Sequence, residues 1–318
     1  MSIFQTSIIV TGGTQGLGYH TALILAQKYP NILIIVASRT DPENSASNIN
    51  QTLKQSNVKY VPLDLGSKST VRSFAQTWAQ GNYPPIQALV LNAGIQIAGD
   101  ISYSPDGIEK TFAINHVGHA LLYHLLKDSL TLDARIVVTA SGVHDPAQKS
   151  GIHAHYTTAS DVGIPSAESI KKSYGRGRYA TSKVANVLWT YALARRLPAG
   201  QTVTAMDPGL MPGTNLAREM PAFARWLIHH VLPKMIPVLK LLTGSGNVHL
   251  PAESGAALAR LAVGDDVKGK TGVYYEGQKE IKSSEQSLKV DLQEELWKWT
   301  VDFVAESKEE KERFAKGV

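Results

Sequence analysis

Short apolar runs alternate with longer amphipathic stretches along most of the chain. Seven runs rich in Val, Ile and Leu predict strands at residues 6–11, 32–38, 58–64, 88–93, 135–141, 202–207 and 271–276. Several of these runs are almost continuously apolar, as in strands covered on both faces. Between them, helical patterns occur at residues 17–29, 43–55, 68–80, 107–127, 179–197, 253–263 and 291–305. This alternation predicts an α/β protein with a doubly wound, mostly parallel, seven-stranded sheet and helices on both faces.

No linker divides the chain, so we expect one domain over residues 1–318. Two long connections break the alternation, at residues 142–178 and 212–250. Both follow predicted strands, and long connections at the carboxyl ends of parallel strands usually shape a ligand site. The last twelve residues, SKEEKERFAKGV, are highly charged and predict a frayed helix or tail.

A glycine-rich loop joins the first predicted strand to the first predicted helix, in the stretch IIVTGGTQGLG. Its first glycine allows a tight turn, its third lets another molecule approach the backbone, and its last lets the helix pack on the sheet. The helix N-terminus then offers unpaired amides to a pyrophosphate. This pattern predicts a Rossmann-type dinucleotide site. The loop residues expected at the cofactor are Gly12, Thr14, Gln15, Gly16, Leu17 and Gly18.

The end of the second predicted strand indicates which dinucleotide binds. Sites for NAD often carry an acid there, which holds the ribose 2′-hydroxyl. Here Ser38 and Arg39 occupy that place, and a guanidinium suits a 2′-phosphate. We therefore expect NADP(H) rather than NAD(H). The alternative is that Arg39 is a solvated surface arginine, and the nearby Asp41 weakens the preference.

Tyr179 and Lys183 have the i, i+4 spacing that places two side chains on one face of a helix. A free tyrosine has a pKa of about 10 and is a poor acid or base at neutral pH. An ammonium at ~4 Å attracts a phenolate by about 4 kcal/mol at an effective dielectric of ~20. That attraction would lower the tyrosine pKa by roughly 2–3 units before desolvation opposes it. The pair predicts a general acid or base, although the same spacing also occurs by chance.

Further polar residues map to the carboxyl edge of the predicted sheet or to an adjoining helix. Ser141 ends the fifth strand, where its hydroxyl could bond a substrate carbonyl. Asn115 lies inside a long predicted helix, and a polar residue among apolar ones there suggests a functional role. Asp64 and Leu65 end the third strand, placed to meet an adenine ring. Small-residue turns close two more strands, at Asn92-Ala93-Gly94 and at Pro208-Gly209.

Together these motifs resemble the short-chain dehydrogenase/reductase family. The matching motifs are TGGTQGLG at 11–18, DL at 64–65, NAG at 92–94, Asn115, Ser141, YATSK at 179–183 and PG at 208–209. They run in the family's order and cover roughly residues 5–275 of the chain. The stretches NHVGHALLYHLL and DPGLMPGTNLAR further resemble its retinol-dehydrogenase-like and protochlorophyllide-reductase-like branch.

The resemblance implies a role for each residue. Tyr179 would exchange a proton with the substrate, while Lys183 would lower the pKa of Tyr179 and bond the nicotinamide ribose. Ser141 would orient the reacting carbonyl. Asn115 would hold a water that links Lys183 to a proton relay. Thr214 would contact the nicotinamide amide, although the family's usual threonine position holds Gly213 here.

The interval between Ser141 and Tyr179 is much longer than the family's usual dozen or so residues. The intervening residues, 142–178, could loop over the site. The substrate pocket therefore cannot be predicted from the motif.

Composition narrows the partners of the chain. The formal charge is +5, with scattered basic residues, so no nucleic-acid partner is expected. The chain has no cysteine, which suits a reducing compartment, and no apolar run of ~20 residues. We expect a cytoplasmic protein. The pair His116 and His119 has metal-ligand spacing but no third ligand, so no metal is expected. His144 either lines the substrate pocket or is an ordinary loop histidine.

Residues 223–242 mix apolar and basic side chains and contain two prolines. Three interpretations compete: a lid over an apolar substrate, which we favour, a peripheral membrane contact, or a core helix pair. A homodimer is open, since family members often pair through the helices that carry Asn115 and Tyr179.

The sequence thus predicts an NADP(H)-dependent oxidoreductase for the carbonyl, alcohol or conjugated C=C group of a fairly large apolar or aromatic small molecule. The alternatives are a membrane-associated retinoid- or steroid-type alcohol dehydrogenase and a non-catalytic NADP-binding regulator.

Overall fold

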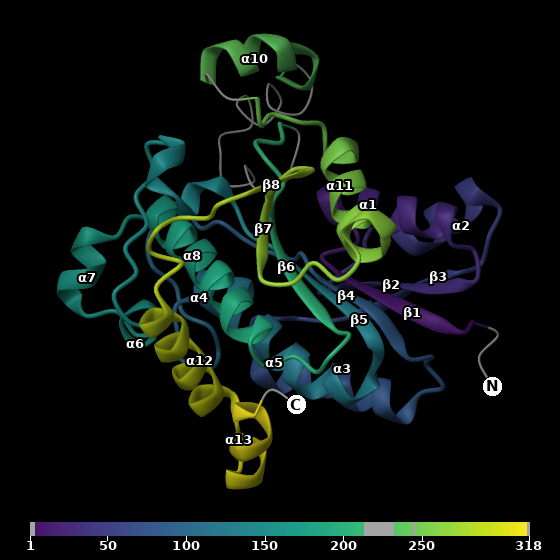
Figure 1. Cartoon of the computed structure of the whole chain (residues 1–318), viewed down its shortest axis with the longest axis horizontal. Coiled ribbons are helices and arrows are strands. Elements are labelled where there is room, and N and C mark those ends of the chain that lie inside the picture. Colours follow the sequence, from purple (N-terminus) through teal and green to yellow (C-terminus); the bar gives the residue numbers. More distant parts are fainter. Residues whose placement is uncertain (1–3, 213–231, 244–245, 317–318) are drawn as a thin grey trace.

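The computed structural model describes residues 4–212, 232–243 and 246–316. Thr214 and residues 223–231 lie outside the described residues, so the predictions made for them stay predictions. In the described part, one sheet runs through the molecule in the order β3-β2-β1-β4-β5-β6-β7-β8 (Figure 1). Its strands are β1 (Thr6–Thr11), β2 (Ile32–Ser38), β3 (Val58–Pro62), β4 (Ile86–Leu91), β5 (Leu130–Thr139), β6 (Thr202–Asp207), β7 (Val273–Glu276) and β8 (Lys279–Ile281).

The described residues confirm the mostly parallel sheet and correct its strand number. Strands β1 to β7 pair in parallel with their neighbours. The eighth strand, β8, pairs with β7 in the antiparallel direction. Its three residues, Lys279-Glu280-Ile281, are too few and too polar to give a periodic signal, so a seven-stranded sheet was the wrong prediction.

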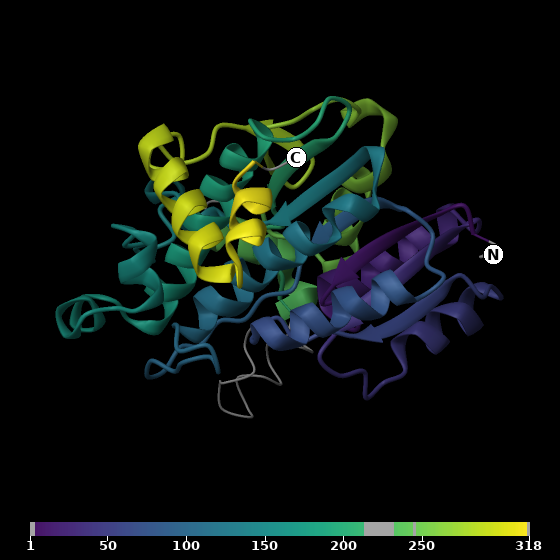
Figure 2. The same ribbon diagram turned by 90° about the horizontal axis from the view of Figure 1, so that it is seen from below.

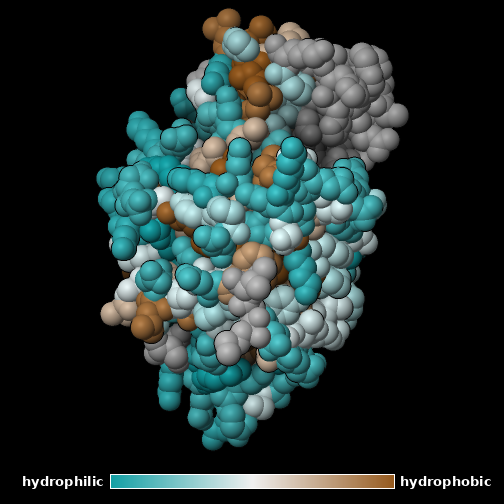
Figure 3. All heavy atoms as spheres, turned by 90° about the vertical axis from the view of Figure 1, so that its right-hand side faces the viewer, coloured by the Kyte–Doolittle hydropathy of each residue, from teal (hydrophilic) through white to brown (hydrophobic). Residues whose placement is uncertain are grey.

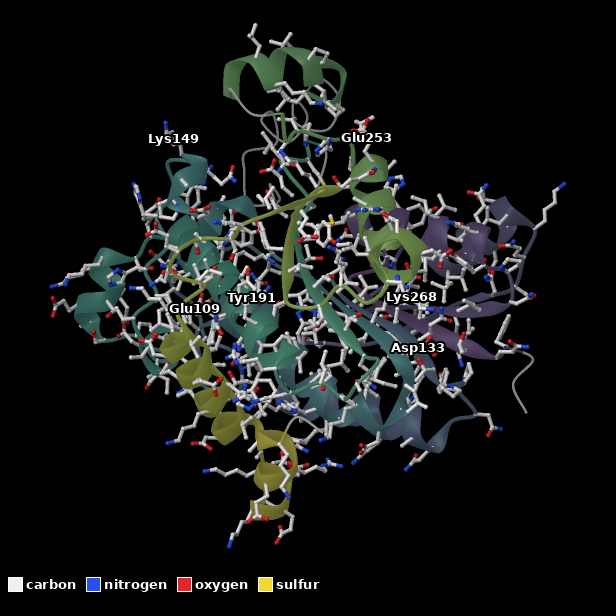
Figure 4. All side chains as sticks on the ribbon, viewed as in Figure 1. Glu109, Asp133, Lys149, Tyr191, Glu253 and Lys268 are labelled. Atoms are coloured by element: carbon white, nitrogen blue, oxygen red, sulfur yellow. The ribbon has the colours of Figure 1, made fainter. Side chains whose placement is uncertain are left out.

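Helices cover both faces of the sheet, as the alternation predicts (Figure 2). One face carries α1 (Gly16–Lys28), α2 (Ser45–Leu53) and α11 (Pro251–Val263). The other face carries α3 (Lys68–Gln80), α5 (Gly118–Leu126) and α8 (Gly175–Ala194), with α12 (Val290–Val304) packed on α8. In Figure 4, Glu109 and Tyr191 lie on the α8 side, and Glu253 and Lys268 lie on the α11 side.

The core has two halves because successive strand residues point to opposite faces. In β1, Ile9 packs under the α3, α5 and α8 layer, whereas Ile8 and Val10 pack under α1 and α11. All three side chains are fully buried. The near-continuous apolar strands of the sequence are therefore explained by burial on both sides.

The first long connection contains short elements that the sequence pattern does not reveal. It holds two 3₁₀ turns at Gly142–His144 and Pro146–Gln148, then α6 (Ala159–Gly163) and α7 (Ala167–Lys172). Lys149 lies at the outer tip of this region (Figure 4).

The second long connection contains α10 (Ile236–Thr243), which stands apart from the sheet (Figure 1). Its Val238 is 42% exposed and its Leu241 is 83% exposed. Apolar side chains accordingly gather over α10 on the face seen in Figure 3. No helix in the described ranges is both long and apolar enough to cross a bilayer.

The predicted charged tail is instead an ordered helix, α13 (Lys308–Ala315). Ser307 caps it by accepting a hydrogen bond from the Glu310 N–H at 3.1 Å. Phe314, on its inner face, is fully buried and stacks on His124 of α5 at a ring distance of 4.6 Å. A single aromatic anchor thus fixes a segment whose composition suggests a solvated end.

Candidate active site

A cleft opens at the carboxyl edge of the sheet where the strand order reverses between β1 and β4, the usual ligand position of a doubly wound fold. The predicted cofactor residues that line it are Gly12, Thr14, Gln15, Gly16, Leu17, Gly18, Ser38, Arg39, Asp64, Leu65, Asn92, Ala93, Gly94, Tyr179, Lys183 and Pro208. Residues not predicted from the sequence also line it, among them Ile95, Ile97, Lys110 and Met211. Sequence motifs from five strands therefore meet at one concave surface.

The glycine loop is shaped for close backbone contact. Gly12 and Gly16 have φ values of +66° and +53°, which favour glycine. A Cβ atom at Gly18 would lie 2.2 Å from the Gly12 carbonyl oxygen, so only glycine permits this packing of α1 on the turn. At Gly16 a Cβ atom would meet nothing within 4 Å, which leaves the backbone open to the cleft.

The end of β2 offers polar groups to the cleft. Ser38 has a buried Oγ atom without a hydrogen-bond partner, and Arg39 lines the cleft beside it. Asp41, which weakened the NADP(H) preference, has its Oδ1 atom bonded to the Ser45 N–H at 2.9 Å, at the start of α2. This carboxylate is therefore engaged in holding the helix terminus.

Thr11, at the end of β1, joins the glycine loop to the Asn92-Ala93-Gly94 turn. Its hydroxyl oxygen accepts the N–H groups of Asn92 at 2.8 Å and Ala93 at 3.0 Å. It also bonds His119 Nε2 at 2.8 Å, and His119 Nδ1 bonds the Asn115 carbonyl oxygen at 3.1 Å. Since a carbonyl only accepts, Nδ1 carries the histidine proton. Burial lowers the pKa of His119 to about 4, so this link is neutral.

Asn115 lies in a π-helical turn, Ala113–Val117, between α4 (Lys110–Phe112) and α5. Such turns often occur at functional sites. Its side chain is fully buried and clasps Ile95: Oδ1 accepts the Ile95 N–H at 2.8 Å, and Nδ2 donates to the Ile95 carbonyl at 3.0 Å. Asn115 therefore fixes the loop beneath the cleft, and the sequence's single helix over 107–127 is interrupted at this residue.

Tyr179 lines the cleft and meets Ser141, which is not itself among the lining residues. Their hydroxyl groups hydrogen-bond each other, and Tyr179 is 8% exposed. Burial, and after it the negative charge of Asp207, raise the pKa of Tyr179, while the Ser141 bond opposes this. The spacing argument predicts a lowered pKa. That prediction is wrong for this structure, because burial and the charge of Asp207 outweigh the Ser141 bond.

Lys183 lies next to Tyr179, with its Nζ atom 5.5 Å from the centre of the Tyr179 ring. The same nitrogen donates to the Thr139 carbonyl at 2.8 Å. Burial lowers the pKa of Lys183 to about 8, against a smaller opposing effect of Asp207. Its ammonium still predominates at neutral pH, by about ten to one, but it is held at the cost of burial.

His144 supports Ser141 and does not line the cleft. It is 1% exposed, its Nδ1–H donates to the Ser141 carbonyl at 2.8 Å, and its Nε2 accepts the Ser284 N–H at 3.1 Å. Burial lowers its pKa, so the ring is neutral. Neither sequence interpretation of His144 anticipated this role, because Ser284 is distant in sequence.

The remaining predicted residues have separate surroundings. Gly209 is absent from the cleft lining, and its N–H donates to Asp207 Oδ1 at 3.0 Å. His116 bonds Thr300 Oγ1 at 3.0 Å, away from the partners of His119. Within the described ranges, no cluster of three or more His, Cys, Asp or Glu side chains could hold a metal ion.

Comparison with known proteins identifies the family. A family model described as short chain dehydrogenase matches residues 6–159. The chain is 30% identical over 306 residues to the chloroplastic short-chain dehydrogenase TIC 32 B of Brassica napus, covering 93% of this chain and 88% of the relative. The chain belongs to the short-chain dehydrogenase/reductase family. This family is one of oxidoreductases, and the resemblance seen in the sequence is confirmed.

Two further relatives place this dehydrogenase/reductase in the retinol-dehydrogenase-like branch. It is 30% identical to human polyprenol dehydrogenase, over 91% of this chain and 82% of the relative. It is also 30% identical to mouse retinol dehydrogenase 14, over 92% and 83%. A solved short-chain dehydrogenase from Shigella flexneri, complexed with NADP, superposes with a TM-score of 0.60 at 22% identity, over 87% of this chain and 98% of that one. This last likeness shows the fold.

Proposed function

We propose that this protein is an NADP(H)-dependent oxidoreductase that interconverts a carbonyl and an alcohol on a fairly large apolar substrate, with Tyr179 as the general acid or base. The observation that carries the proposal is the position of one phenol. Tyr179 lines the dinucleotide-type cleft, bonds Ser141 and lies beside Lys183. A proton donor, an orienting hydroxyl and a cation thus converge at the end of the cleft.

The cleft fits a dinucleotide. The open backbone at Gly16 and the N-terminus of α1 suit a pyrophosphate. The unpartnered Ser38 hydroxyl and the Arg39 guanidinium suit a ribose 2′-phosphate, which supports NADP(H). Asp64 and Leu65 would flank the adenine. When bound, the nicotinamide supplies or accepts the hydride.

The chain's own residues would manage the proton. With a raised pKa, Tyr179 is a neutral phenol at physiological pH, the form that donates a proton to a carbonyl oxygen. Ser141 would hold that oxygen while Lys183 stabilises any phenolate that forms. Asn115 would act as a positioning residue, because its side chain holds the Ile95 backbone at the cleft. This charge state favours the reductive direction.

An apolar substrate is supported by the cleft and by the relatives. Ile95, Ile97 and Met211 contribute apolar surface to the lining. Two relatives are named for polyprenol and retinol, both long apolar alcohols. We infer that a long apolar alcohol, or its carbonyl form, is the substrate class. The exposed apolar side chains of α10 favour a second candidate, a membrane-associated alcohol dehydrogenase of the same chemistry.

The first experiment replaces Tyr179 with Phe and follows NADPH oxidation with a panel of ketones, quinones, enones and long-chain aldehydes. Loss of the proton donor should reduce turnover by about 100-fold or more. Tyr191→Phe is the matched control, because Tyr191 lies on the same helix and bonds Ser283 outside the cleft. Equal turnover by both variants would remove the acid/base role. NADPH binding without turnover in the wild type would favour the non-catalytic regulator.

The second experiment tests the choice of cofactor. Arg39→Ala removes one charged hydrogen-bonding group, which is worth about 1.5–3 kcal/mol. We expect NADPH to bind about 10-fold to 100-fold more weakly and NADH to be almost unaffected, measured by fluorescence titration. Arg176→Ala, which removes an exposed arginine outside the cleft lining, serves as the control. Tighter binding of NADH than of NADPH by the wild type would contradict the assignment.

A further inference from the structure

Asp207, the last residue of β6, is a buried acid beside the proposed reaction site. It is 5% exposed. Its Oδ1 accepts the Gly209 N–H at 3.0 Å, and its Oδ2 accepts Asn247 Nδ2 at 2.6 Å. The Gly142 N–H also donates to the carboxylate. Both oxygens accept N–H bonds, which is the pattern of an ionised carboxylate.

We propose that Asp207 is a positioning residue of this site, whose carboxylate holds the turn that carries Ser141 and supplies a buried negative charge facing Tyr179 and Lys183. The inference rests on the proposed function for its catalytic meaning.

The turn after Ser141 is held from two sides. On one side His144 donates to the Ser141 carbonyl. On the other side Asp207 accepts the N–H of the next residue, Gly142. A Cβ atom at Gly142 would lie 2.7 Å from Asp207 Oδ2, so the contact leaves no room for a side chain. The backbone at Ser141 is therefore held by His144 from within the turn and by Asp207 from β6.

The charge of Asp207 acts on ionisable groups of two elements. On α8 it raises the pKa of Tyr179 and opposes the burial that lowers the pKa of Lys183. On β7, burial and after it Asp207 raise the pKa of Tyr274. Burial also raises the pKa of Asp207 itself, and Glu276 adds to this, whereas the hydrogen bonds from Gly209, Gly142 and Asn247 lower it and favour the carboxylate. His144, close to Ser141, is kept neutral by burial.

The consequence for the reaction is a bias in protonation. A negative charge favours the protonated forms of both neighbours, namely the Tyr179 phenol and the Lys183 ammonium. These are the forms that donate protons. Asp207 thus favours the protonated forms that carbonyl reduction needs near neutral pH. It disfavours the Tyr179 phenolate that alcohol oxidation needs.

The decisive measurement needs no substrate. Lysines are labelled with carbon-13 at Cε, and the Lys183 resonance is assigned by comparison with Lys183→Met. In the cofactor-free protein we expect the Lys183 titration of Asp207→Asn to fall by about one pH unit or more below that of the wild type. Glu276→Gln is the matched control, since it removes a neighbouring acid on the paired strand and should leave the Lys183 titration in place.

Turnover of the best carbonyl in the panel with NADPH is the second readout. Asp207→Asn should lose about 10-fold or more. Asp207→Glu keeps the charge but displaces the Gly142 bond, so it should keep the Lys183 titration while losing turnover. It also serves if Asp207→Asn does not fold, as judged by thermal melting. An unchanged Lys183 titration in Asp207→Asn, or a lowered one in Asp207→Glu, overturns the proposal. Undiminished turnover by Tyr179→Phe would defeat the proposed function and leave the titration result standing.

Discussion

At the scale of single residues, the proposed chemistry depends on two ionisable groups, Tyr179 and Lys183, whose pKa values are shifted by burial. Lys183 is 2% exposed, and its pKa is lowered from 10.5 to about 8. The motif Tyr-x-x-x-Lys could be recognised from spacing alone. Its energetics could not, because desolvation and the charge of Asp207 arise from segments distant in sequence. The contact of His144 with Ser284 and the place of Asp207 beside Tyr179 could not be predicted for the same reason.

Replacing Lys183 with Met should remove a stability cost that depends on pH. Between pH 8 and 10.5 the unfolded lysine binds more protons than the folded one, so the stability of the wild type rises with pH in this range. Below pH 8 the full cost of burying the charged lysine is present. The stability difference between variant and wild type should shrink by about 3 kcal/mol from pH 7 to 10.5. Asn186 would still donate to the Thr139 carbonyl.

Urea unfolding at both pH values checks this expectation, with the exposed Lys149→Met as a control. A pH-independent difference would show that Lys183 is well solvated in the folded protein. Activity of Lys183→Met should fall in parallel, which separates its functional use from its stability cost.

At the scale of elements, long periodic segments were predicted well and short ones were not. The bounds of β1, β2, β6 and α3 agree with the prediction. In contrast, β8, α6 and α7 have only a few residues each, and tertiary contacts decide their structure. The sequence also could not reveal that Phe314 anchors α13, since one aromatic residue in a charged stretch gives no period.

Phe314→Ala should therefore destabilise the protein although it lies four residues from the end of the chain. Removing a buried phenylalanine costs about 3–5 kcal/mol, and fraying of α13 should keep the loss near the lower value. Denaturant unfolding measures it, with the exposed Glu312→Ala as the matched variant. A loss of unfolding free energy below about 1 kcal/mol would show that α13 adds little to stability, as expected of a frayed tail.

At the scale of the whole molecule, α10 lies apart from the sheet and its covering helices (Figure 1), so packing of the fold does not account for this element. Its Val238 and Leu241 side chains are exposed, and neither belongs to the two core layers (Figure 3). The sequence predicted an apolar segment here and left a lid, a membrane contact and a core helix open. The exposure of Leu241 excludes the core for that side chain.

We expect Leu241→Glu to raise the KM for long apolar carbonyls about tenfold and to leave small ones unaffected, as for a lid. Val290→Glu, at another exposed apolar position, is the comparison. Liposome flotation of the intact protein provides the opposing test. If the wild type floats with liposomes and Leu241→Glu does not, the result favours the membrane contact over the lid.

The short antiparallel strand β8 closes one border of the sheet with charged Lys279 and Glu280. At the opposite border, β3 presents an exposed Lys59 and ends in Pro62, which has no backbone N–H. Charges, brevity and proline are the devices by which natural proteins discourage neighbouring molecules from extending their sheets. Growth of fibril-like stacks from the folded state is thereby disfavoured at both borders.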